Sequence, residues 1–211
     1  MIVFWFAVCG VLGYLLGSFN GAILVSRWFR GEDVRARGSG NAGLTNFYRN
    51  YGGADTLLVL LIDVCKTVVA CFVGRAILGA YDPNWRAEGA MFCGGLSVIG
   101  HVFPLYFGFR GGKGILTCGT LAAFVDWRII AILLGFFILL VLLTRYVSLA
   151  SIICCFIYPL LFWWVYPGES KVMMTIMACC LAALAAWMHR SNLKRLLAGT
   201  ESKFSVHKKK P

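Results

Sequence analysis

Long apolar segments dominate this sequence and decide what it can fold into. The chain has 211 residues, and 60% of them are hydrophobic, whereas soluble globular domains contain about 45–50% apolar residues. Its mean hydropathy is +0.78. This excess is too large for the core of one domain of this size, so we expect many apolar side chains to face lipid. The length suits a single membrane-embedded domain over residues 1–211, with no room for a second, soluble one.

The apolar segments indicate helices rather than strands, because a helix of about 20 residues crosses the hydrocarbon of a bilayer. The stretch 114–143 fits either one bent helix or a short span followed by a full one. Asp126 and Arg128 favour two helices, since charges at mid-membrane are costly. We therefore predict an all-α, polytopic integral membrane bundle of about seven transmembrane helices. They cover residues 2–28, 55–80, 88–108, 114–126, 128–144, 147–166 and 171–189.

Lysine and arginine are distributed unevenly between the two sets of predicted connections. With the N-terminus outside, most of the 20 basic residues fall on the cytoplasmic side, and only Arg75, Arg86, Arg128 and Lys171 fall outside. Cytoplasmic loops of membrane proteins carry such an excess, so we predict an outside N-terminus and a cytoplasmic C-terminus. All the glycine-rich or polar clusters then share the cytoplasmic face, and we expect several loops of that face to assemble one site.

The first cluster is "GSGNAGLTNFYRN", residues 38–50. Gly38, Gly40 and Gly43 match G-x-G-x-x-G, but that pattern marks a dinucleotide site only within a βαβ unit, and a membrane helix precedes it here. Without a Cβ, glycines let consecutive N–H groups turn toward an anion. The cluster also supplies polar side chains suited to phosphate: Ser39, Asn41, Thr45, Asn46 and Arg49. The alternative is a simple tight turn.

The second cluster is "FRGGKG", residues 109–114. Gly111, Gly112 and Gly114 surround Lys113, and Arg110 is adjacent. Glycines beside two cations at the start of a helix can bind an anion, although the segment lacks the Ser or Thr that follows the lysine of a phosphate loop. The alternative is a turn whose cations only anchor the cytoplasmic end of a helix.

The third cluster is "HRSNLKRLLAGTE", residues 189–201. His189 and Asn192 share a helix face at i, i+3, and the leucines that follow are typical of a helix lying on the membrane surface. His189 alone is equally typical of an interfacial anchor. The basic tail, residues 207–211, indicates attachment to anionic lipid. We find no nucleic-acid motif and predict no nucleic-acid partner.

Two charges lie deep within the second predicted span. Asp63 and Lys66 are spaced i, i+3, and ionisable residues in lipid usually pair and face the bundle interior. They form a structural ion pair or line the site. His101, in the third span, either closes a polar network under the loops or satisfies a neighbouring carbonyl. The nine cysteines form no CxxC pair, so we expect them to act as small hydrophobes and predict neither a metal nor a cofactor.

Three motifs together carry a resemblance to a known family. "GSGNAGLTNFYR", "GHVFPLYFGFRGGKG" and "HRSNLKRLLAGTESK" resemble the bacterial acyl-phosphate:glycerol-3-phosphate acyltransferases, the PlsY family, and the likeness runs from "LLGSFNGA" (residues 15–22) to Lys203. The resemblance implies an inner-membrane enzyme with its motifs in the cytoplasm. It would move a fatty acyl group from acyl phosphate to the 1-hydroxyl of sn-glycerol 3-phosphate, the first acylation step of phospholipid biosynthesis. Both substrates carry phosphate, which suits the two predicted anion-binding loops.

The resemblance also implies roles for particular residues. Ser39, Arg49, His189 and Asn192 would be catalytic, and Glu201 would hold structure. In "RYVSLAS" either Ser148 or Ser151 would contact substrate, and we favour Ser151. Thr67 is a departure, because the family commonly has glycine after the lysine that corresponds to Lys66. The substrate-binding set would be Gly38, Gly40, Asn41, Gly43, Thr45, Asn46, Arg110, Gly111, Gly112, Lys113, Gly114 and Ser151.

Acyl phosphate is already activated, so the enzyme needs positioning and charge stabilisation more than a strong nucleophile. We expect direct attack by the glycerol hydroxyl, with the proton passing to His189 or to the acyl phosphate itself. Covalent catalysis by Ser39 is the alternative. The H-x4-D pattern of thioester-dependent acyltransferases is missing, because Tyr106 and Lys194 stand five residues after His101 and His189. A transporter of phosphorylated anions is the rival class, but the chain has no visible internal repeat.

Overall fold

The computed structural model describes residues 1–204, and these residues form helices and connecting loops without any strand. The predicted lipid anchor at residues 207–211 lies outside the described residues. The chain divides into two compact units, Met1–Val125 and Asp126–Pro211, which are described one at a time. That both belong to a single domain stays a prediction.

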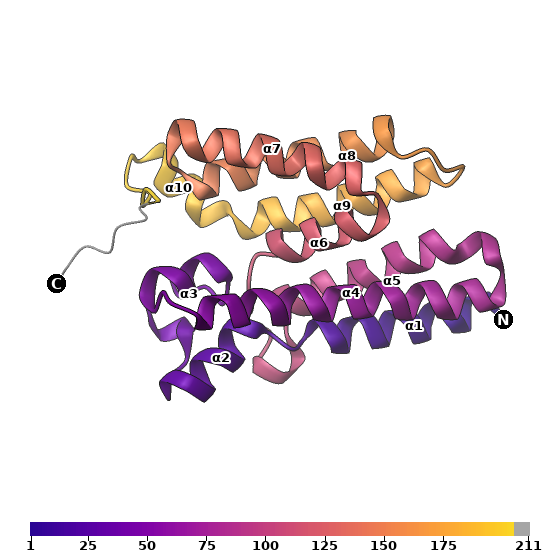
Figure 1. Ribbon diagram of the computed structural model, residues 1–211, viewed down its shortest axis with the longest axis horizontal. Coiled ribbons are helices and arrows are strands. Elements are labelled where there is room, and N and C mark those ends of the chain that lie inside the picture. The colour runs from indigo at the N-terminus through magenta and orange to yellow at the C-terminus, as the bar shows by residue number, and fades with distance from the viewer. Residues whose placement is uncertain (205–211) are drawn as a thin grey trace. The chain divides into compact units, whose positions relative to one another are not determined.

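The first unit is built around three long helices that run side by side in Figure 1: α1, α4 and α5. Their backbones touch at glycines, as is common where helices pack in a membrane. A Cβ on Gly17 would lie 2.0 Å from the carbonyl oxygen of Ser97, and a Cβ on Gly74 would lie 2.0 Å from that of Gly89. The helices of this unit are α1 (Ile2–Gly17), α2 (Gly21–Arg30), α3 (Leu44–Asn50), α4 (Asp55–Tyr81), α5 (Arg86–Val102) and α6 (Ile115–Val125). Three 3-10 turns connect them: η1 (Val34–Ala36), η2 (Pro83–Trp85) and η3 (Leu105–Phe107).

The segment predicted as one span at residues 2–28 consists of two helices. α1 ends at Gly17, and the side chain of Asn20 accepts a hydrogen bond from the N–H of Ile23 to cap the start of α2. α2 buries Ile23 but exposes Trp28, as a helix at a membrane interface does. The apolar run hid this break, because hydropathy does not register a single capping asparagine.

The second unit contains α7 (Trp127–Thr144), α8 (Val147–Val165), α9 (Lys171–Met188) and α10 (Arg190–Leu197). The predicted interruption near residue 126 is confirmed. α6 ends at Val125, and the carboxylate of Asp126 accepts from the N–H of Arg128 to cap α7. α10 exposes Leu197 and buries Asn192, which fits the amphipathic helix that the sequence predicted.

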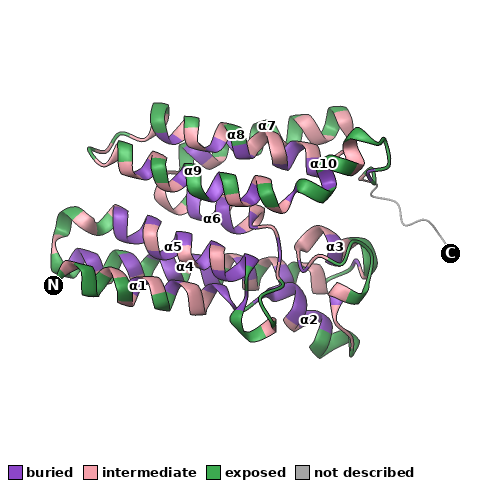
Figure 2. Cartoon of the chain, turned by 180° about the vertical axis from the view of Figure 1, so that it is seen from behind, coloured by how far each residue is buried: buried purple, intermediate pink, exposed green. Residues whose placement is uncertain are grey.

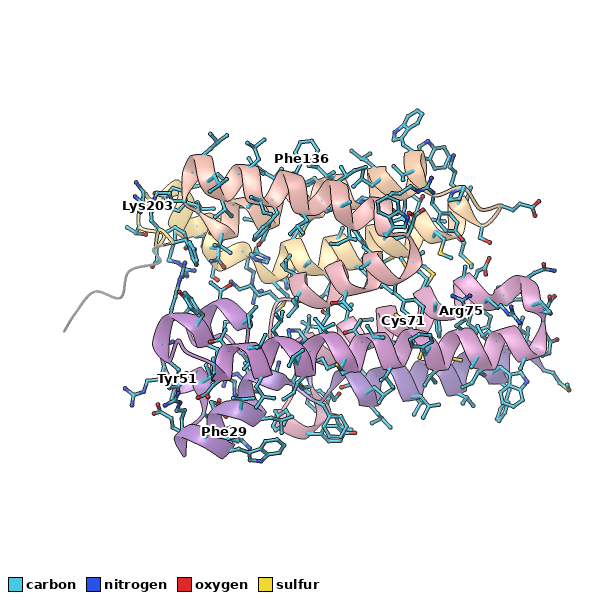
Figure 3. The ribbon with its side chains drawn as sticks, in the orientation of Figure 1. Phe29, Tyr51, Cys71, Arg75, Phe136 and Lys203 are labelled. Carbon is cyan, nitrogen blue, oxygen red and sulfur yellow. The ribbon has the colours of Figure 1, made fainter. Side chains whose placement is uncertain are left out.

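Six helical segments among the described residues are long and apolar enough to cross a membrane: Ile2–Arg30, Asp55–Tyr81, Pro83–Phe107, Trp127–Thr144, Val147–Val165 and Lys171–Met188. α6, which corresponds to the predicted span at residues 114–126, is apolar but has only 11 residues. Exposed positions run along α7 in Figure 2, and Phe136 points outward from it in Figure 3. The all-helical, multi-pass architecture is therefore confirmed, while the count of seven spans and the orientation stay predictions.

Candidate functional site

The first two motifs meet at one end of the first unit. In Figure 3, Tyr51 lies at this end of α4 and Arg75 toward the opposite end. The N–H of Ala42 in the first loop donates to the carbonyl oxygen of Gly111 in the second loop, at 3.4 Å. The expectation that separate loops come together is thus confirmed for the motifs of this unit.

A cleft of about 560 Å³ lies between these two loops, and Ser39, Gly40, Arg110 and Gly111, four of the predicted site residues, line it. Its complete lining is Asp33, Arg35, Ala36, Ser39, Gly40, Phe107, Gly108, Arg110 and Gly111. The serine of the first motif and a cation of the second therefore face one concave space, which suits a small polar ligand.

Arg35 is a site residue that the sequence did not single out. Its Nη1 donates to the carbonyl oxygens of Phe107 (2.7 Å) and Arg110 (2.8 Å), and its Nε and Nη2 donate to the carboxylate of Asp33. One guanidinium thus bridges the two loops. Burial raises the pKa of Asp33, but the hydrogen bonds from Arg35 and Arg27 outweigh it and hold that pKa well below its usual range. The only sequence signal was the D-x-R spacing before the first glycine cluster.

Asn46 organises the first loop from within. Its Oδ1 accepts from the N–H of Ser39 (2.9 Å), and its Nδ2 donates to the carbonyl oxygens of Arg37 (3.1 Å) and Asn41 (2.9 Å). Gly38 has a φ of +56°, and a Cβ there would lie 2.5 Å from Asn46 Oδ1. The N–H of Ser39 is therefore bonded within the loop, contrary to the expected use of that amide for an anion, although Ser39 is among the residues that line the cleft.

The rest of the first motif lies on or just before α3. Gly43 precedes the helix in an extended conformation, and Thr45, Asn46 and Arg49 lie on it, with Arg49 exposed in its last turn. α3 therefore carries the predicted guanidinium of the first motif.

The second loop packs tightly against the end of α5. The N–H of Gly111 donates to the carbonyl oxygen of Val102 (3.0 Å), and that of Gly112 donates to the carbonyl oxygen of His101 (3.1 Å). These two amides are bonded inside the protein, so the amide-lined anion site that the sequence predicted does not form at them. The glycines instead allow close approach, while Gly114 takes a φ of +84° just before α6. Lys113 lies between the tightly packed glycines and the helix.

Asp63, Lys66 and His101 form a buried ionic group beneath these loops. Lys66 Nζ lies 2.7 Å from Asp63 Oδ1 and 3.0 Å from His101 Nδ1, and it donates to the carbonyl oxygen of Phe19 at 2.8 Å. The predicted Asp63–Lys66 pair is confirmed, and His101 closes the network. The hydroxyl of Thr67, the departure from the family pattern, donates to the carbonyl oxygen of Asp63.

In the second unit, Glu201 ties the third motif to α8. Its Oε1 accepts from Ser148 Oγ and Asn192 Nδ2, each at 2.8 Å, and its Oε2 accepts from Arg195 Nε at 2.7 Å. Burial raises the pKa of Glu201, but these three donors outweigh it and lower that pKa below its usual value. The arrangement agrees with the structural role expected for Glu201. Ser151, which we favoured over Ser148, instead donates to the carbonyl oxygen of Val147 in its own helix.

His189 is buried at the junction of α9 and α10. Its Nδ1 lies 2.8 Å from the carbonyl oxygen of Ala185. A carbonyl can only accept, so Nδ1 carries the hydrogen and a neutral ring has its lone pair on Nε2. This tautomer suits a proton acceptor. Among residues 1–204, no cluster of three or more His, Cys, Asp or Glu side chains suits a metal ion.

The sequence and the fold both match one group of proteins. The profile of the family described as glycerol-3-phosphate acyltransferase matches residues 7–199. A glycerol-3-phosphate acyltransferase of Pseudomonas paraeruginosa is 40% identical over 92% of this chain and 97% of its own length, and one of Prochlorococcus marinus is 37% identical over 90% and 91%.

Two crystal structures of PlsY, an integral membrane glycerol 3-phosphate acyltransferase, are also similar. The glycerol 3-phosphate form has a TM-score of 0.81 and 32% identity over 95% of this chain and 96% of its own. The lysophosphatidic acid form has a TM-score of 0.79 and 30% identity over 96% and 97%. Because the family profile matches residues 7–199 and these relatives are 30–40% identical over most of the chain, this protein belongs to the glycerol-3-phosphate acyltransferase family.

Proposed function

We propose that this chain transfers a fatty acyl group from acyl phosphate to the 1-hydroxyl of sn-glycerol 3-phosphate, which gives 1-acyl-glycerol 3-phosphate and phosphate. The observation that carries the proposal is the cleft that Ser39 of the first motif and Arg110 of the second both line. Relatives crystallised in glycerol 3-phosphate and lysophosphatidic acid forms support this acceptor and this product. The missing H-x4-D pattern and the cations of both loops favour acyl phosphate as the donor.

The proposed roles follow charge and hydrogen-bonding capacity. Arg49, Arg110 and Lys113 bind the two phosphates, because guanidinium and ammonium groups are strong phosphate ligands. The hydroxyl of Ser39 donates a hydrogen bond to a substrate oxygen. Asn41 and Thr45 add neutral donors on the same segment. Asn46 acts indirectly, because its amide is engaged by the loop itself.

The proposed chemistry is a direct displacement without an acyl-enzyme. The hydroxyl oxygen of glycerol 3-phosphate attacks the acyl carbon, the bond from that carbon to the bridging oxygen breaks, and phosphate leaves with both electrons of that bond. The hydroxyl proton passes either to Nε2 of His189 or to an oxygen of the leaving phosphate. The tautomer of His189 supports the first route, with Asn192 as its neighbour on the same helix face.

We further propose that the protein resides in the bacterial cell membrane with its N-terminus outside, its C-terminus in the cytoplasm and α6 as a seventh crossing. The distribution of lysine and arginine supports this orientation. So does the placing of both glycine-rich loops at one end of the first unit. The amphipathic α2, with Trp28 exposed beside Arg27 and Arg30, would then lie in the cytoplasmic interface.

The purified protein in detergent or liposomes tests the proposal. We expect it to convert labelled glycerol 3-phosphate and an acyl phosphate into labelled 1-acyl-glycerol 3-phosphate, and to remain inactive with acyl-CoA. Arg49→Ala and Lys113→Ala should reduce turnover in the same preparation. Formation of product with acyl-CoA but not with acyl phosphate would overturn acyl phosphate as the proposed donor. Movement of glycerol 3-phosphate across sealed liposomes without any acylation would favour the transporter instead.

A further inference from the structure

The buried ionic group of Asp63, Lys66 and His101 takes no part in the acyl transfer as proposed. We propose that it is the positioning device of the second loop: Lys66 fixes the imidazole of His101, and that imidazole sets the place of Gly112 and hence of Lys113. This inference rests on the proposed function, in which Lys113 binds a substrate phosphate.

The first step is that every N–H donor of the Lys66 ammonium group has an acceptor. An ammonium group has three donors, and Nζ of Lys66 has three acceptors around it: Asp63 Oδ1, the carbonyl oxygen of Phe19 and His101 Nδ1. Nδ1 of His101 lies 3.0 Å from Lys66 Nζ and 3.5 Å from Asp63 Oδ1. We assign Nδ1 as the acceptor of the shorter contact, which places the hydrogen of the neutral imidazole on Nε2. The ring is therefore held in one orientation by a charged hydrogen bond in a site that excludes water, since both side chains are only 5% exposed.

The second step is the contact between this ring and the loop. A Cβ on Gly112 would lie 2.1 Å from Nε2 and 2.9 Å from Cε1 of His101, far closer than atoms approach without a bond. The N–H of Gly112 donates to the carbonyl oxygen of the same histidine. The far edge of the imidazole is thus the surface on which Gly112 rests, one residue before Lys113.

The third step is energetic. Apolar residues of similar volume often replace a buried ion pair at no loss of stability, because desolvation offsets the attraction between the charges. Here Oδ2 of Asp63 has no hydrogen-bond partner within the described part of the chain, and a buried polar atom without a partner lowers stability. Stability alone therefore does not explain the group, whereas a defined position for Lys113 does. Such a role makes His101 a positioning residue that acts through the loop.

A double-variant experiment isolates this contact. His101→Asn keeps an acceptor close to where Nδ1 stood, so Lys66 retains its partner, but it removes Nε2 and Cε1. Gly112→Ala alone should raise the KM for glycerol 3-phosphate about 10-fold to 100-fold, since misplacement by about an ångström costs that much. Combined with His101→Asn, Gly112→Ala should recover most of that loss, because the two closest atoms that its Cβ meets are gone and only the carbonyl oxygen of Ala42, at 3.0 Å, remains.

Gly111→Ala is the matched control. Its Cβ would lie 2.0 Å from the backbone carbonyl oxygen of His101, which no substitution at residue 101 removes. His101→Asn should therefore rescue Gly112→Ala but leave Gly111→Ala as impaired as before. Equal rescue of both glycine variants, rescue of neither, or normal kinetics for Gly112→Ala would overturn the inference.

A second measurement separates positioning from folding. Asp63→Asn with Lys66→Met removes both charges and should keep the thermal unfolding temperature near that of the parent, yet raise the KM for glycerol 3-phosphate with a smaller effect on kcat. A parental KM in this variant would contradict the inference. If the unmodified protein itself forms no lysophosphatidic acid, the proposed function fails instead, and the two failures are thereby distinguished.

Discussion

Arg35→Ala removes the side chain that joins the two loops of the cleft. Two hydrogen bonds to the carbonyl oxygens of Phe107 and Arg110 disappear, and a hydrogen bond with a charged donor contributes about 1.5–3 kcal/mol. The side chain of Arg35 is 22% exposed, so water replaces part of this interaction. We therefore discount the sum of about 3–6 kcal/mol for the two bonds to about 2–3 kcal/mol for the pair together.

If this free energy holds the second loop in its binding position, kcat/KM for glycerol 3-phosphate should fall about 30-fold to 150-fold, at 1.4 kcal/mol for each factor of ten. Steady-state kinetics with acyl phosphate as donor measure this fall, and added guanidinium ion should restore part of the activity of Arg35→Ala. Arg37→Ala is the matched control, because the side chain of Arg37 pairs with Glu32 on the surface and such pairs contribute little. An Arg35→Ala enzyme within about twofold of the parent would refute the reasoning, because a change that small removes no transition-state contact.

Three further predictions concern the second unit. Glu201→Gln should lower kcat, because an amide replaces the carboxylate that accepts from Ser148, Asn192 and Arg195. Folding lowers the pKa of Glu201, so the carboxylate contributes stability above the ordinary glutamate pKa and loses that contribution as pH falls through the lowered pKa. Unfolding curves of the parent and the variant, from neutral to acid pH, measure this loss. Ser148→Ala should reduce activity more than Ser151→Ala, because Ser148 bonds to Glu201 whereas Ser151 bonds only to its own helix; assays of both at matched expression check this order, and the reverse order would restore Ser151 as the substrate contact. His189→Gln should lose the acidic limb of the pH–rate profile together with most of its turnover if His189 accepts the proton; substantial turnover at full expression would leave the acyl phosphate as the acceptor.

The helices of this fold could be predicted from the sequence because hydropathy is a strong and local signal. Residues 128–144 and 147–166 were predicted within a residue or two of α7 and α8. The first span was predicted less well, because the break at residues 18–20 depends on one asparagine side chain. α6 fell short of spanning length because Gly114 and Asp126 limit it at its two ends.

The candidate site was predictable in its residue types but not in its contacts. Glycines next to cations indicated anion binding, yet the amides of Gly111 and Gly112 are bonded to the end of α5. The sequence alone does not show which acceptor a backbone N–H bonds to. Arg35 was overlooked for the same reason, because its partners Phe107 and Arg110 lie more than 70 residues away in the chain.

The buried charges show how local and distant information combine. The i, i+3 spacing of Asp63 and Lys66 was enough to predict their pairing, since both lie on one helix face. His101 comes from another helix, so the sequence left its part in the network as one of two alternatives, and the fold decides between them. Once α4 and α5 pack through glycines such as Gly74, the imidazole stands between a charge in the bundle and the loop that carries Lys113. The same close packing that the apolar helices need thus brings a buried charge within reach of the proposed phosphate-binding loop, and the geometry of that loop depends on residues that no substrate contacts.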